Sequence, residues 1–219
     1  MNSMKQALLI VFTFTLIVMP PFQAALAAVV APSLGTADSF AVLGNTTVTN
    51  TTTGSTIITG NLGVYPGTSV TGFPPGILVG GVIHAADGVA SDAQKNASTA
   101  YNTLKNLPFD SDLSGRDLGG MTPNPGVYSF SSSAALTGEL TLDAKGNRNA
   151  VWVFQIGSTL TTASASSVKL INGGQSINVL WQVGSSATLG TNTTFTGTIL
   201  ALQSITLNTA TECGATSRA

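Results

Sequence analysis

The stretch Phe154-Gln155-Ile156-Gly157-Ser158 returns later in the chain as Trp181-Gln182-Val183-Gly184-Ser185. A second phrase, Ser186-Ala187-Thr188-Leu189-Gly190-Thr191-Asn192-Thr193, returns as Ser204-Ile205-Thr206-Leu207-Asn208-Thr209-Ala210-Thr211. Repeats at such spacings are typical of solenoids, in which every coil places the same positions on the same wall. The repeats therefore predict a β-solenoid with one wall of Thr, Ser and small side chains.

Short β-branched runs between Gly and Pro residues predict further strands on both sides of the repeats. In a run such as Leu140-Thr141-Leu142, alternate side chains point inward and outward, so buried Leu and Val residues hold the coils in register. The Thr- and Asn-rich block 45–53 is interpreted as a coil face or a loop of the same solenoid. The expected strands are 40–43, 56–59, 61–65, 77–79, 127–130, 136–142, 151–156, 167–171, 179–183 and 195–202.

Between Ala85 and Leu107 the apolar spacing changes to three and four, which is one stripe of an amphipathic helix. Asp87 is the expected N-cap, and Pro108 lies just past the expected end. The pattern predicts one helix over about residues 87–107 that covers one wall of the solenoid. The polar segment 110–121 is expected to be a loop or cap that returns the chain to the strands. The stripe consists of Val89, Ala93, Ala97, Ala100, Tyr101 and Leu104.

Composition excludes several classes of protein. Only 8% of the 219 residues are charged, and 8 Lys and Arg against 9 Asp and Glu give no clustered positive charge for a nucleic-acid partner. The single Cys213 cannot form an internal disulfide, so we expect stacked strands and a buried apolar stripe to supply the stability.

The N-terminal segment 1–27 has the features of a secretory signal peptide. Lys5 precedes an apolar run from Ala7 to Val18, and Ala25-Leu26-Ala27 is a small-x-small cleavage site. The run is shorter than the roughly 20 residues that a membrane span needs. We therefore expect a secreted mature domain over residues 28–219, without stable membrane association.

Side chains for catalysis or for binding a metal are scarce. Glu139 and Asp143 stand four residues apart, about 13 Å along a strand, whereas a retaining glycosidase needs about 5–5.5 Å between its carboxyl groups. The only histidine, His84, has no second metal ligand nearby and is expected to bond a backbone group at the helix entry. Cys213 lacks a nearby base, and no phosphate-binding loop is present. The sequence predicts no catalytic residues, no metal site and no cofactor, so the protein is not expected to be an enzyme.

An outward Thr array forms a grid of hydroxyls and methyls. Alternate residues of a strand lie about 6.6–6.8 Å apart, and neighbouring strands about 4.7–4.9 Å apart. These spacings are similar to those between water oxygens in ice planes. Each contact is weak, since a net hydrogen bond contributes only about 0.5–1.5 kcal/mol. Only a rigid, repeated and uncharged array could hold an ordered water lattice.

Several motifs, in order, resemble those of the microbial ice-binding proteins. They are Thr59-Gly60-Asn61-Leu62-Gly63-Val64, Thr71-Gly72-Phe73-Pro74-Pro75-Gly76, Ile83-His84-Ala85-Ala86-Asp87, Pro125-Gly126-Val127-Tyr128, Val151-Trp152-Val153-Phe154-Gln155-Ile156-Gly157-Ser158 and Trp181-Gln182-Val183-Gly184-Ser185. The resemblance implies a mainly β fold, namely a right-handed discontinuous β-solenoid of triangular cross-section with one long α-helix alongside. It also implies ice adsorption through one flat face without a cofactor.

The Thr-containing motif and the C-terminal segment both depart from the pattern of this family. Its loose Thr-Ala/Gly-x-Thr/Asn motif is matched in part by Thr162-Ala163-Ser164-Ala165 and Leu189-Gly190-Thr191-Asn192. The family continues with a turn and further strands where this chain ends at residues 212–219. We therefore expect a truncated or atypical C-terminus that leaves a strand edge open.

The sequence thus predicts a secreted, monomeric ice-binding protein whose partner is the ice crystal surface. The resemblance implies antifreeze activity, namely thermal hysteresis and inhibition of ice recrystallisation. The expected ice-binding residues are Thr159, Thr161, Thr162, Ser164, Ser166, Thr188, Thr191, Thr193, Thr206, Thr209 and Thr211.

Alternatives remain open at this point. Thr is also simply a good strand former on a solvated face. A second hypothesis is an extracellular adhesin or a polysaccharide-binding module, which would present aromatic side chains such as Trp152 or Trp181. A polysaccharide-cleaving enzyme is a third hypothesis, which the spacing of the carboxylates disfavours. In a eukaryotic host, a glycan on the sequon at Asn192 would obstruct the proposed face.

Overall fold

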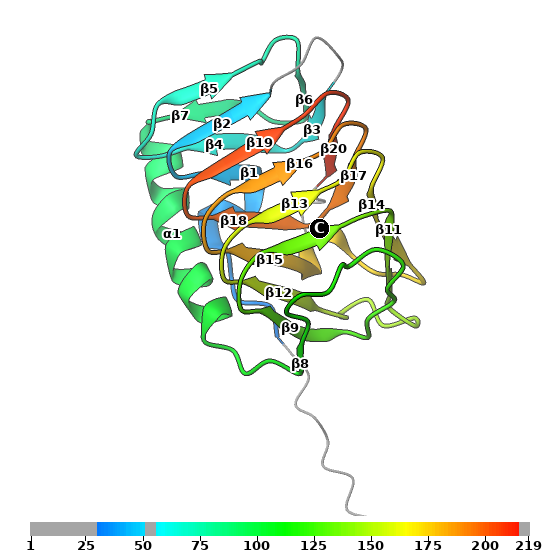
Figure 1. Ribbon diagram of the computed structural model, residues 1–219. Coiled ribbons are helices and arrows are strands. Elements are labelled where there is room, and N and C mark those ends of the chain that lie inside the picture. The colour runs from blue at the N-terminus through cyan, green and yellow to red at the C-terminus, as the bar shows by residue number, and fades with distance from the viewer. Residues whose placement is uncertain (1–29, 51–55, 215–219) are drawn as a thin grey trace, which may run out of the picture.

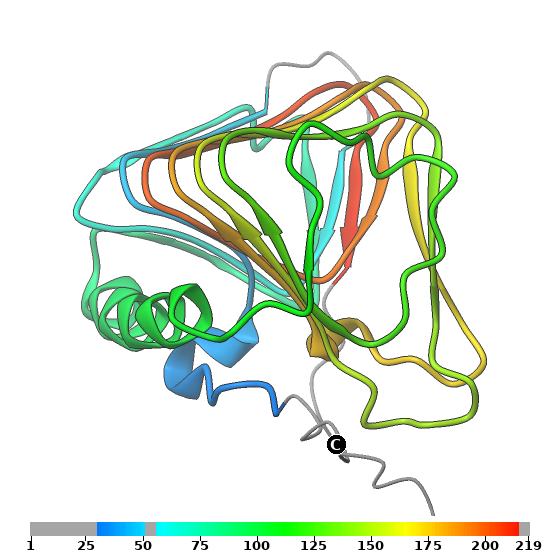
Figure 2. The ribbon, with the colours of Figure 1, turned by 60° about the horizontal axis from the view of Figure 1, so that its bottom comes forward.

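The computed structural model describes residues 30–50 and 56–214. The expected signal peptide, residues 1–27, lies outside the described residues. Parallel strands form three sheets, which are the three walls of a solenoid with a triangular cross-section (Figure 1, Figure 2). This confirms the predicted fold class.

Six coils each contribute one strand to each wall in turn, and β7 and β8 add one further strand at either end of sheet A. Sheet A has the order β7-β4-β1-β18-β15-β12-β9-β8. Sheet B has the order β10-β13-β16-β19-β2-β5, and sheet C has the order β11-β14-β17-β20-β3-β6.

The bounds of the strands are as follows. Sheet A contains β1 (Phe40–Gly44), β4 (Asn61–Val64), β7 (Ile83–Ala85), β8 (Ser111–Asp112), β9 (Gly126–Phe130), β12 (Trp152–Ile156), β15 (Val179–Val183) and β18 (Thr198–Ala201). Sheet B contains β2 (Thr47–Asn50), β5 (Ser69–Thr71), β10 (Ala134–Leu136), β13 (Leu160–Thr162), β16 (Ala187–Leu189) and β19 (Ser204–Leu207). Sheet C contains β3 (Ile57–Thr59), β6 (Ile77–Val79), β11 (Glu139–Asp143), β14 (Ser167–Ile171), β17 (Thr194–Thr196) and β20 (Glu212–Gly214).

The solenoid is discontinuous because the order of coils in space differs from their order in the chain. The last coil, β18 to β20, lies between the first coil, β1 to β3, and the coil of β15 to β17. Strands β18, β19 and β20 each pair with the first coil on one side and with the coil of β15 to β17 on the other. The expected open edge at the end of the chain is therefore wrong for the described residues, since β20 pairs with both β17 and β3.

The sequence repeats correspond to successive coils. Phe154 of β12 pairs with Trp181 of β15, and Ala187 of β16 pairs with Ile205 of β19. These partners are the same residues that the repeated phrases place in equivalent positions. The offset between two copies of a phrase is thus the length of one coil.

The interior is apolar and contains a stack of aromatic rings. Ring centroids lie 5.7 Å apart for Tyr128 and Phe154, 4.2 Å for Phe154 and Trp181, and 4.9 Å for Trp181 and Phe195. Burying each large apolar side chain stabilises the fold by roughly 1.5–3 kcal/mol. Identical positions in successive coils therefore hold the coils in register.

The helix α1 (Gly88–Lys105) lies along the outer face of sheet A (Figure 2). It confirms the predicted helix, and the Asp87 carboxylate accepts a hydrogen bond of 2.8 Å from the backbone N–H of Ala90, as expected of an N-cap. The side chains of Ala93, Ala97, Ala100, Tyr101 and Leu104 are buried between α1 and the sheet.

The repeated glutamines attach α1 to sheet A. Gln155 Nε2 donates to the carbonyl oxygens of Leu104 at 2.6 Å, in the last turn of α1, and of Leu107 at 2.9 Å, just past its end. Gln182, its neighbour in the next coil, forms a hydrogen bond with the Tyr101 side chain.

Two predicted strands are each split in the structure. The runs 136–142 and 195–202 turn a corner of the triangle at Gly138, with φ of 89°, and at Gly197, with φ of 111°. Left-handed values of φ favour Gly. Short 3-10 helices occupy Gly35–Ser39 and Ser176–Asn178.

Candidate functional site

The outward side of sheet B carries one in-register column of Thr residues. Register pairs place Ala135, Thr161, Thr188, Thr206, Thr49 and Thr71 side by side on successive strands. We call these six residues the Thr column. No register shift interrupts sheet B, whereas the β1–β4 pairing in sheet A shifts between Phe40 and Val42. Sheet B faces the viewer in Figure 1.

A second column lies beside it, two residues earlier in each strand. Its members are Ser133, Thr159, Ser186, Ser204, Thr47 and Ser69, and we call them the flanking column. Some of its hydroxyls bond to one another: the side-chain oxygens of Ser133 and Thr159 are 2.8 Å apart, and Thr47 Oγ1 donates to Ser204 Oγ at 3.0 Å.

The hydroxyls of the Thr column, unlike some of those in the flanking column, do not bond to one another. Thr161 and Thr71 are exposed, and Thr49, Thr188 and Thr206 are half-buried. Among the described residues, none of these five hydroxyls has a hydrogen-bond partner in the protein. The Thr column therefore presents hydroxyl groups that are free to bind water.

Sheet B differs from the other two walls in cover and charge. Sheet A is covered by α1. The outward positions of sheet C include Glu139, Asp143, Lys169 and Glu212. The Thr column and the flanking column contain no charged residue, so sheet B is the uncovered, uncharged wall of the described structure.

The eleven residues expected to bind ice fall into three groups. Thr161, Thr188 and Thr206 lie in the Thr column, and Thr159 lies in the flanking column. Ser164, Thr191 and Thr209 line the corner after sheet B, where Ala165 N–H donates to Thr191 O and Asn192 N–H donates to Thr209 O, both at 2.8 Å. Of these three, Ser164 is exposed and the other two are half-buried.

The remaining four residues are buried, so their assignment to an ice-contacting surface is wrong. Thr162 is 3% exposed, Ser166 1%, and Thr193 and Thr211 0%. As the chain turns from sheet B to sheet C, these side chains point inward. Their hydroxyls there bond backbone groups that the corner leaves unpaired.

The contacts of these four hydroxyls are specific. Ser166 Oγ lies 2.9 Å from Leu136 O and 2.8 Å from Ala163 O, so its one proton is shared between these two acceptors. Thr211 Oγ1 donates to Asn208 O at 2.6 Å. The side-chain oxygens of Thr162 and Thr193 are 3.0 Å apart. These hydroxyls support the corner, and we expect no contact with a surface ligand.

Sequence reasoning missed the part of the Thr column that comes from the first two coils. Thr47-Val48-Thr49 and Ser69-Val70-Thr71 have the same alternation as Ser204-Ile205-Thr206. The common pattern was the signal that could have found them. The long stretch of chain between Thr47 and Ser204 concealed that their strands are neighbours in space.

Outside sheet B, several titratable groups have structural partners. His84 Nδ1 lies 2.7 Å from the Asp87 carboxylate, so the expected bond to a backbone group is wrong. The N–H of Ala90 and the His84 side chain lower the pKa of Asp87. Hydrogen bonds from the Asn172 side chain and from the backbone of Lys145 lower the pKa of Asp143. The described residues contain no group of three or more His, Cys, Asp or Glu that could hold a metal ion.

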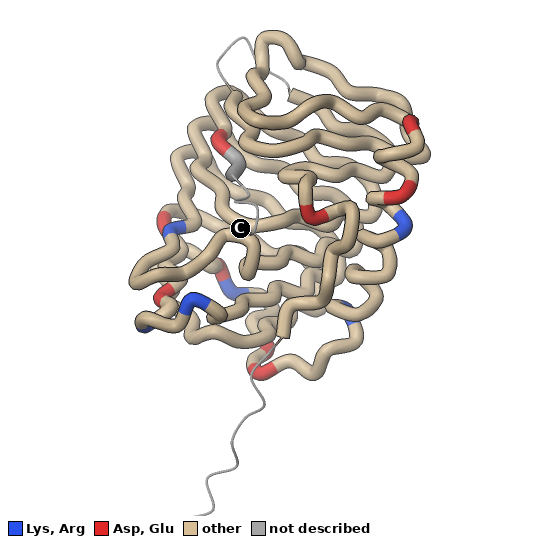
Figure 3. Tube along the Cα trace, turned by 180° about the vertical axis from the view of Figure 1, so that it is seen from behind, with Lys and Arg blue, Asp and Glu red and all other residues tan. Residues whose placement is uncertain are grey.

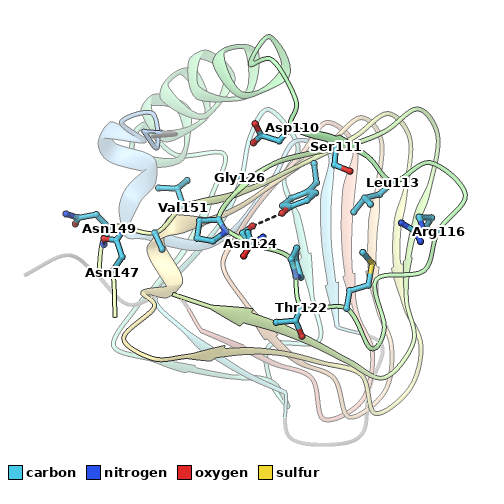
Figure 4. A pocket seen from close by; sticks show the side chains of 15 residues that line it. Asp110, Ser111, Leu113, Arg116, Thr122, Asn124, Gly126, Asn147, Asn149 and Val151 are labelled. Carbon is cyan, nitrogen blue, oxygen red and sulfur yellow. Dashed lines mark hydrogen bonds between the residues drawn. The ribbon is translucent and has the colours of Figure 1, made fainter. Parts of the chain in front are cut away.

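A hollow of about 570 Å³ lies at the β8–β9 end of the solenoid (Figure 4). Several of its polar groups already bond to the protein. Tyr128 Oη donates to Asn124 O at 2.6 Å, and the Asp110 carboxylate accepts from Val127 N–H at 2.7 Å. Burial, together with the nearby charge of Asp110, raises the pKa of Tyr128. These contacts stabilise the end coil and provide no catalytic pair.

The two tryptophans are internal. Trp152 and Trp181 are both 0% exposed, and their indole N–H groups donate to Pro123 O and Thr196 O, each at 3.1 Å. Neither ring offers a face to a sugar. In the described part of the chain, no helix has the length and apolarity that a membrane span requires.

Two solved structures with similar folds are crystal structures of ice-binding proteins. The protein from the Antarctic ascomycete Antarctomyces psychrotrophicus is 36% identical with a TM-score of 0.73, and the match covers 85% of this chain and 98% of that one. An ice-binding protein from an Antarctic biological consortium is 38% identical with a TM-score of 0.75, covering 89% and 95%.

The sequence comparisons agree. An ice-binding protein of Nostoc sp. (strain HG1) is 60% identical over 183 residues, which are 83% of this chain and 66% of that protein. Ice-binding protein 1 of Shewanella frigidimarina (strain NCIMB 400) is 31% identical over 209 residues, which span 82% of this chain and 23% of the longer relative. The chain thus spans just under two thirds of one curated relative and less than a quarter of the other. Residues 42–218 match the family described as Ice-binding-like, and the chain belongs to that family.

Proposed function

We propose that this protein binds ice through the outward face of sheet B. The supporting observation is the Thr column, five threonines and one alanine in unbroken register, with hydroxyls that have no hydrogen-bond partner among the described residues. The relatives reported above are named ice-binding proteins, which supports the same function.

The spacing of the column suits a lattice of water molecules. Strands stack at about 4.7–4.9 Å, so six strands span roughly 24 Å. The flanking column adds a parallel row about 6.6–6.8 Å away. Each Thr offers a hydroxyl that bonds water and a methyl that excludes it. A charged side chain would instead orient water around itself, which explains the advantage of an uncharged wall.

The energetics require many simultaneous contacts. A net hydrogen bond contributes about 0.5–1.5 kcal/mol, and ordering one bridging water costs up to about 2 kcal/mol. A single Thr therefore does not retain ordered water. A column fixed by backbone pairing on both sides has already lost its conformational freedom, so its contacts add up.

Adsorption of this kind leads to antifreeze activity. Ice between anchored molecules must grow as curved fronts, which lowers the freezing point and slows recrystallisation. We therefore propose thermal hysteresis and inhibition of ice recrystallisation as the activities of the protein.

Thr188→Tyr tests the placement of the face. Thr188 lies in the middle of the Thr column, and a Tyr ring there should hold the neighbouring threonines away from the lattice. We expect loss of most of the thermal hysteresis. The matched control is Thr194→Tyr, because Thr194 is exposed on the outward side of sheet C. If a folded Thr188→Tyr protein keeps its activity, sheet B is not the ice-binding face.

The buried tryptophans give no support to the alternative of a polysaccharide-binding module.

We also propose that residues 1–27 direct secretion and that the mature protein begins at Ala28, on the basis of the signal pattern alone. The intact mass of protein recovered from the medium would test this. A mass that includes residues 1–27 would contradict it.

A further inference from the structure

The two ends of the solenoid differ in whether a further segment covers their last strands. At the β8 end, segment 113–121 bonds to the outer edges of the last strands. Leu118 N–H donates to Ala135 O at 2.9 Å, Gly120 N–H donates to Glu139 O at 2.7 Å, and Thr141 N–H donates to Met121 O at 3.0 Å. This segment therefore caps the terminal coil. It also carries Arg116 and Asp117, so the capped end is polar.

At the opposite end, β5, β6 and β7 are the last strands of sheets B, C and A. Their backbone hydrogen bonds run to the preceding coil: Ile77 N–H donates to Thr56 O at 2.8 Å, and Gly60 N–H donates to Val79 O at 3.0 Å. In residues 30–50 and 56–214, no other segment bonds to the outer edges of these three strands. We call this end the uncapped end.

The uncapped end is apolar as well as open. Ile77 and Val79 are each 49% exposed, Val82 57% and Ile83 40%. Residues 57–86 contain no Asp, Glu, Lys or Arg, and most charged residues in Figure 3 lie lower in the molecule or along the helix. Natural edge strands are usually protected by charge or by a covering segment, and terminal repeats usually have a polar outer face. This edge has neither protection.

The backbone of β6 indicates what could cover it. Ile77 N–H and Val79 O both point toward β3. Because successive residues of a strand alternate in direction, the N–H and C=O of Leu78 point to the outer edge. Such an edge pairs with another strand. An uncharged edge does not repel its own copy, and two identical edges related by a two-fold axis normal to the sheet meet antiparallel.

We propose that two copies of this chain associate through their uncapped ends, with β6 pairing antiparallel to β6 of the second copy. With the axis at Leu78, the two Leu78 residues exchange N–H···O=C bonds. Ile77 then lies opposite Val79 of the second copy, which covers apolar side chains that are half exposed in the monomer. The dimer replaces the monomer expected from the sequence. The Thr column lies on a different wall and stays exposed.

The test is sedimentation of purified protein over a concentration series, with two matched lysine variants. Val79→Lys introduces a charge beside the pairing edge at a half-exposed, outward position, so the fold should be retained. We expect the dimer dissociation constant to rise by at least about tenfold, because like charges are brought together across the interface. Thr194→Lys adds the same charge to the same sheet, away from the edge, and should leave dimerisation unchanged.

Hydrogen exchange of the unmodified protein provides a second readout that does not depend on any variant. The Leu78 amide should exchange more slowly as the concentration rises, while the Leu118 amide at the capped end should not change. The proposal is overturned by a monomer at every concentration, by equal effects of the two lysine variants, or by a dimer in which the Leu78 amide gains no protection.

Discussion

Thr193→Val separates the structural hydroxyls from those proposed to bind ice. Thr193 is 0% exposed, and its Oγ1 donates to Ala163 O at 3.3 Å. Because that bond uses the only proton of Thr193, the 3.0 Å contact with Thr162 has the Thr162 hydroxyl as donor. Thr162 Oγ1 in turn accepts from Gly190 N–H at 2.8 Å. Gly190 N–H, the two hydroxyls and Ala163 O thus form one chain of hydrogen bonds across two coils.

The expected change in the free energy of unfolding follows from the hydrogen bonds that Thr193→Val removes. Val has nearly the same shape as Thr, so the change creates no large cavity. It removes the acceptor of the buried Thr162 hydroxyl, which costs about 1–3 kcal/mol. Ala163 O loses one donor but keeps Ser166 Oγ at 2.8 Å, so this loss adds only about 0.5–1.5 kcal/mol. We expect Thr193→Val to lower the free energy of unfolding by about 2–4 kcal/mol.

Urea denaturation measures this change. With a slope of about 1–3 kcal/mol per molar, the midpoint should fall by roughly 1 M or more at unchanged slope. The control is Thr188→Val, which removes a hydroxyl that has no partner in the described part of the chain and should shift stability by less than about 0.5 kcal/mol. The folded Thr193→Val protein should retain its thermal hysteresis. A midpoint equal to that of the unmodified protein would refute the view that the corner hydroxyls are structural.

Three further predictions concern the contacts between coils and the helix. Gln155→Leu removes the donor to the carbonyls at the end of α1, so hydrogen exchange should speed up in the last turn of the helix. Gly184→Ala places a Cβ 2.3 Å from a backbone oxygen of the preceding coil and should lower the melting temperature, whereas Gly88→Ala, with open space around its Cβ, should not. The pKa of Asp87 is lowered by the Ala90 N–H and by His84, so its contribution to stability is present above the ordinary pKa and is lost as pH falls through the lowered value. In acid titrations followed by circular dichroism, Asp87→Asn should lose less helix stability than the unmodified protein over that interval.

The fold could be predicted in large part from local patterns. The repeats that relate Phe154 to Trp181 and Ala187 to Ile205 predicted the coil lengths, because stacked coils place equivalent positions side by side. The helix could be predicted because its apolar spacing and its Asp87 cap are both local signals. The insertion of the last coil beside the first is a long-range pairing, and no local pattern contains it.

The candidate site could be predicted only in part, because Thr has two roles in the same repeat. Thr188 and Thr193 belong to one phrase, yet one faces solvent and the other is fully buried. Period-two alternation fixes the direction of Thr188 within β16. It fails at the corner, where Asn192 has a φ of 57° and redirects the chain. Such a change of direction depends on backbone conformation, which the residue types alone did not reveal.

The distribution of charge explains how sheet B can lack charged side chains on its outward face. With only 8% charged residues, the protein has few groups that keep it soluble. Sheet C carries charges from β11, β14 and β20, and α1 carries Asp92 and Lys95 on its solvent side. The capped end carries Arg116 and Asp117. Asp87, beside His84 of β7, places one carboxylate at the helix side of the uncapped end. Charge is thus found on every described surface except the Thr column, its flanking column and the β5 and β6 strands of the uncapped end. On sheet B the exception fits adsorption to an uncharged lattice, and at the uncapped end it fits pairing with an identical, uncharged edge.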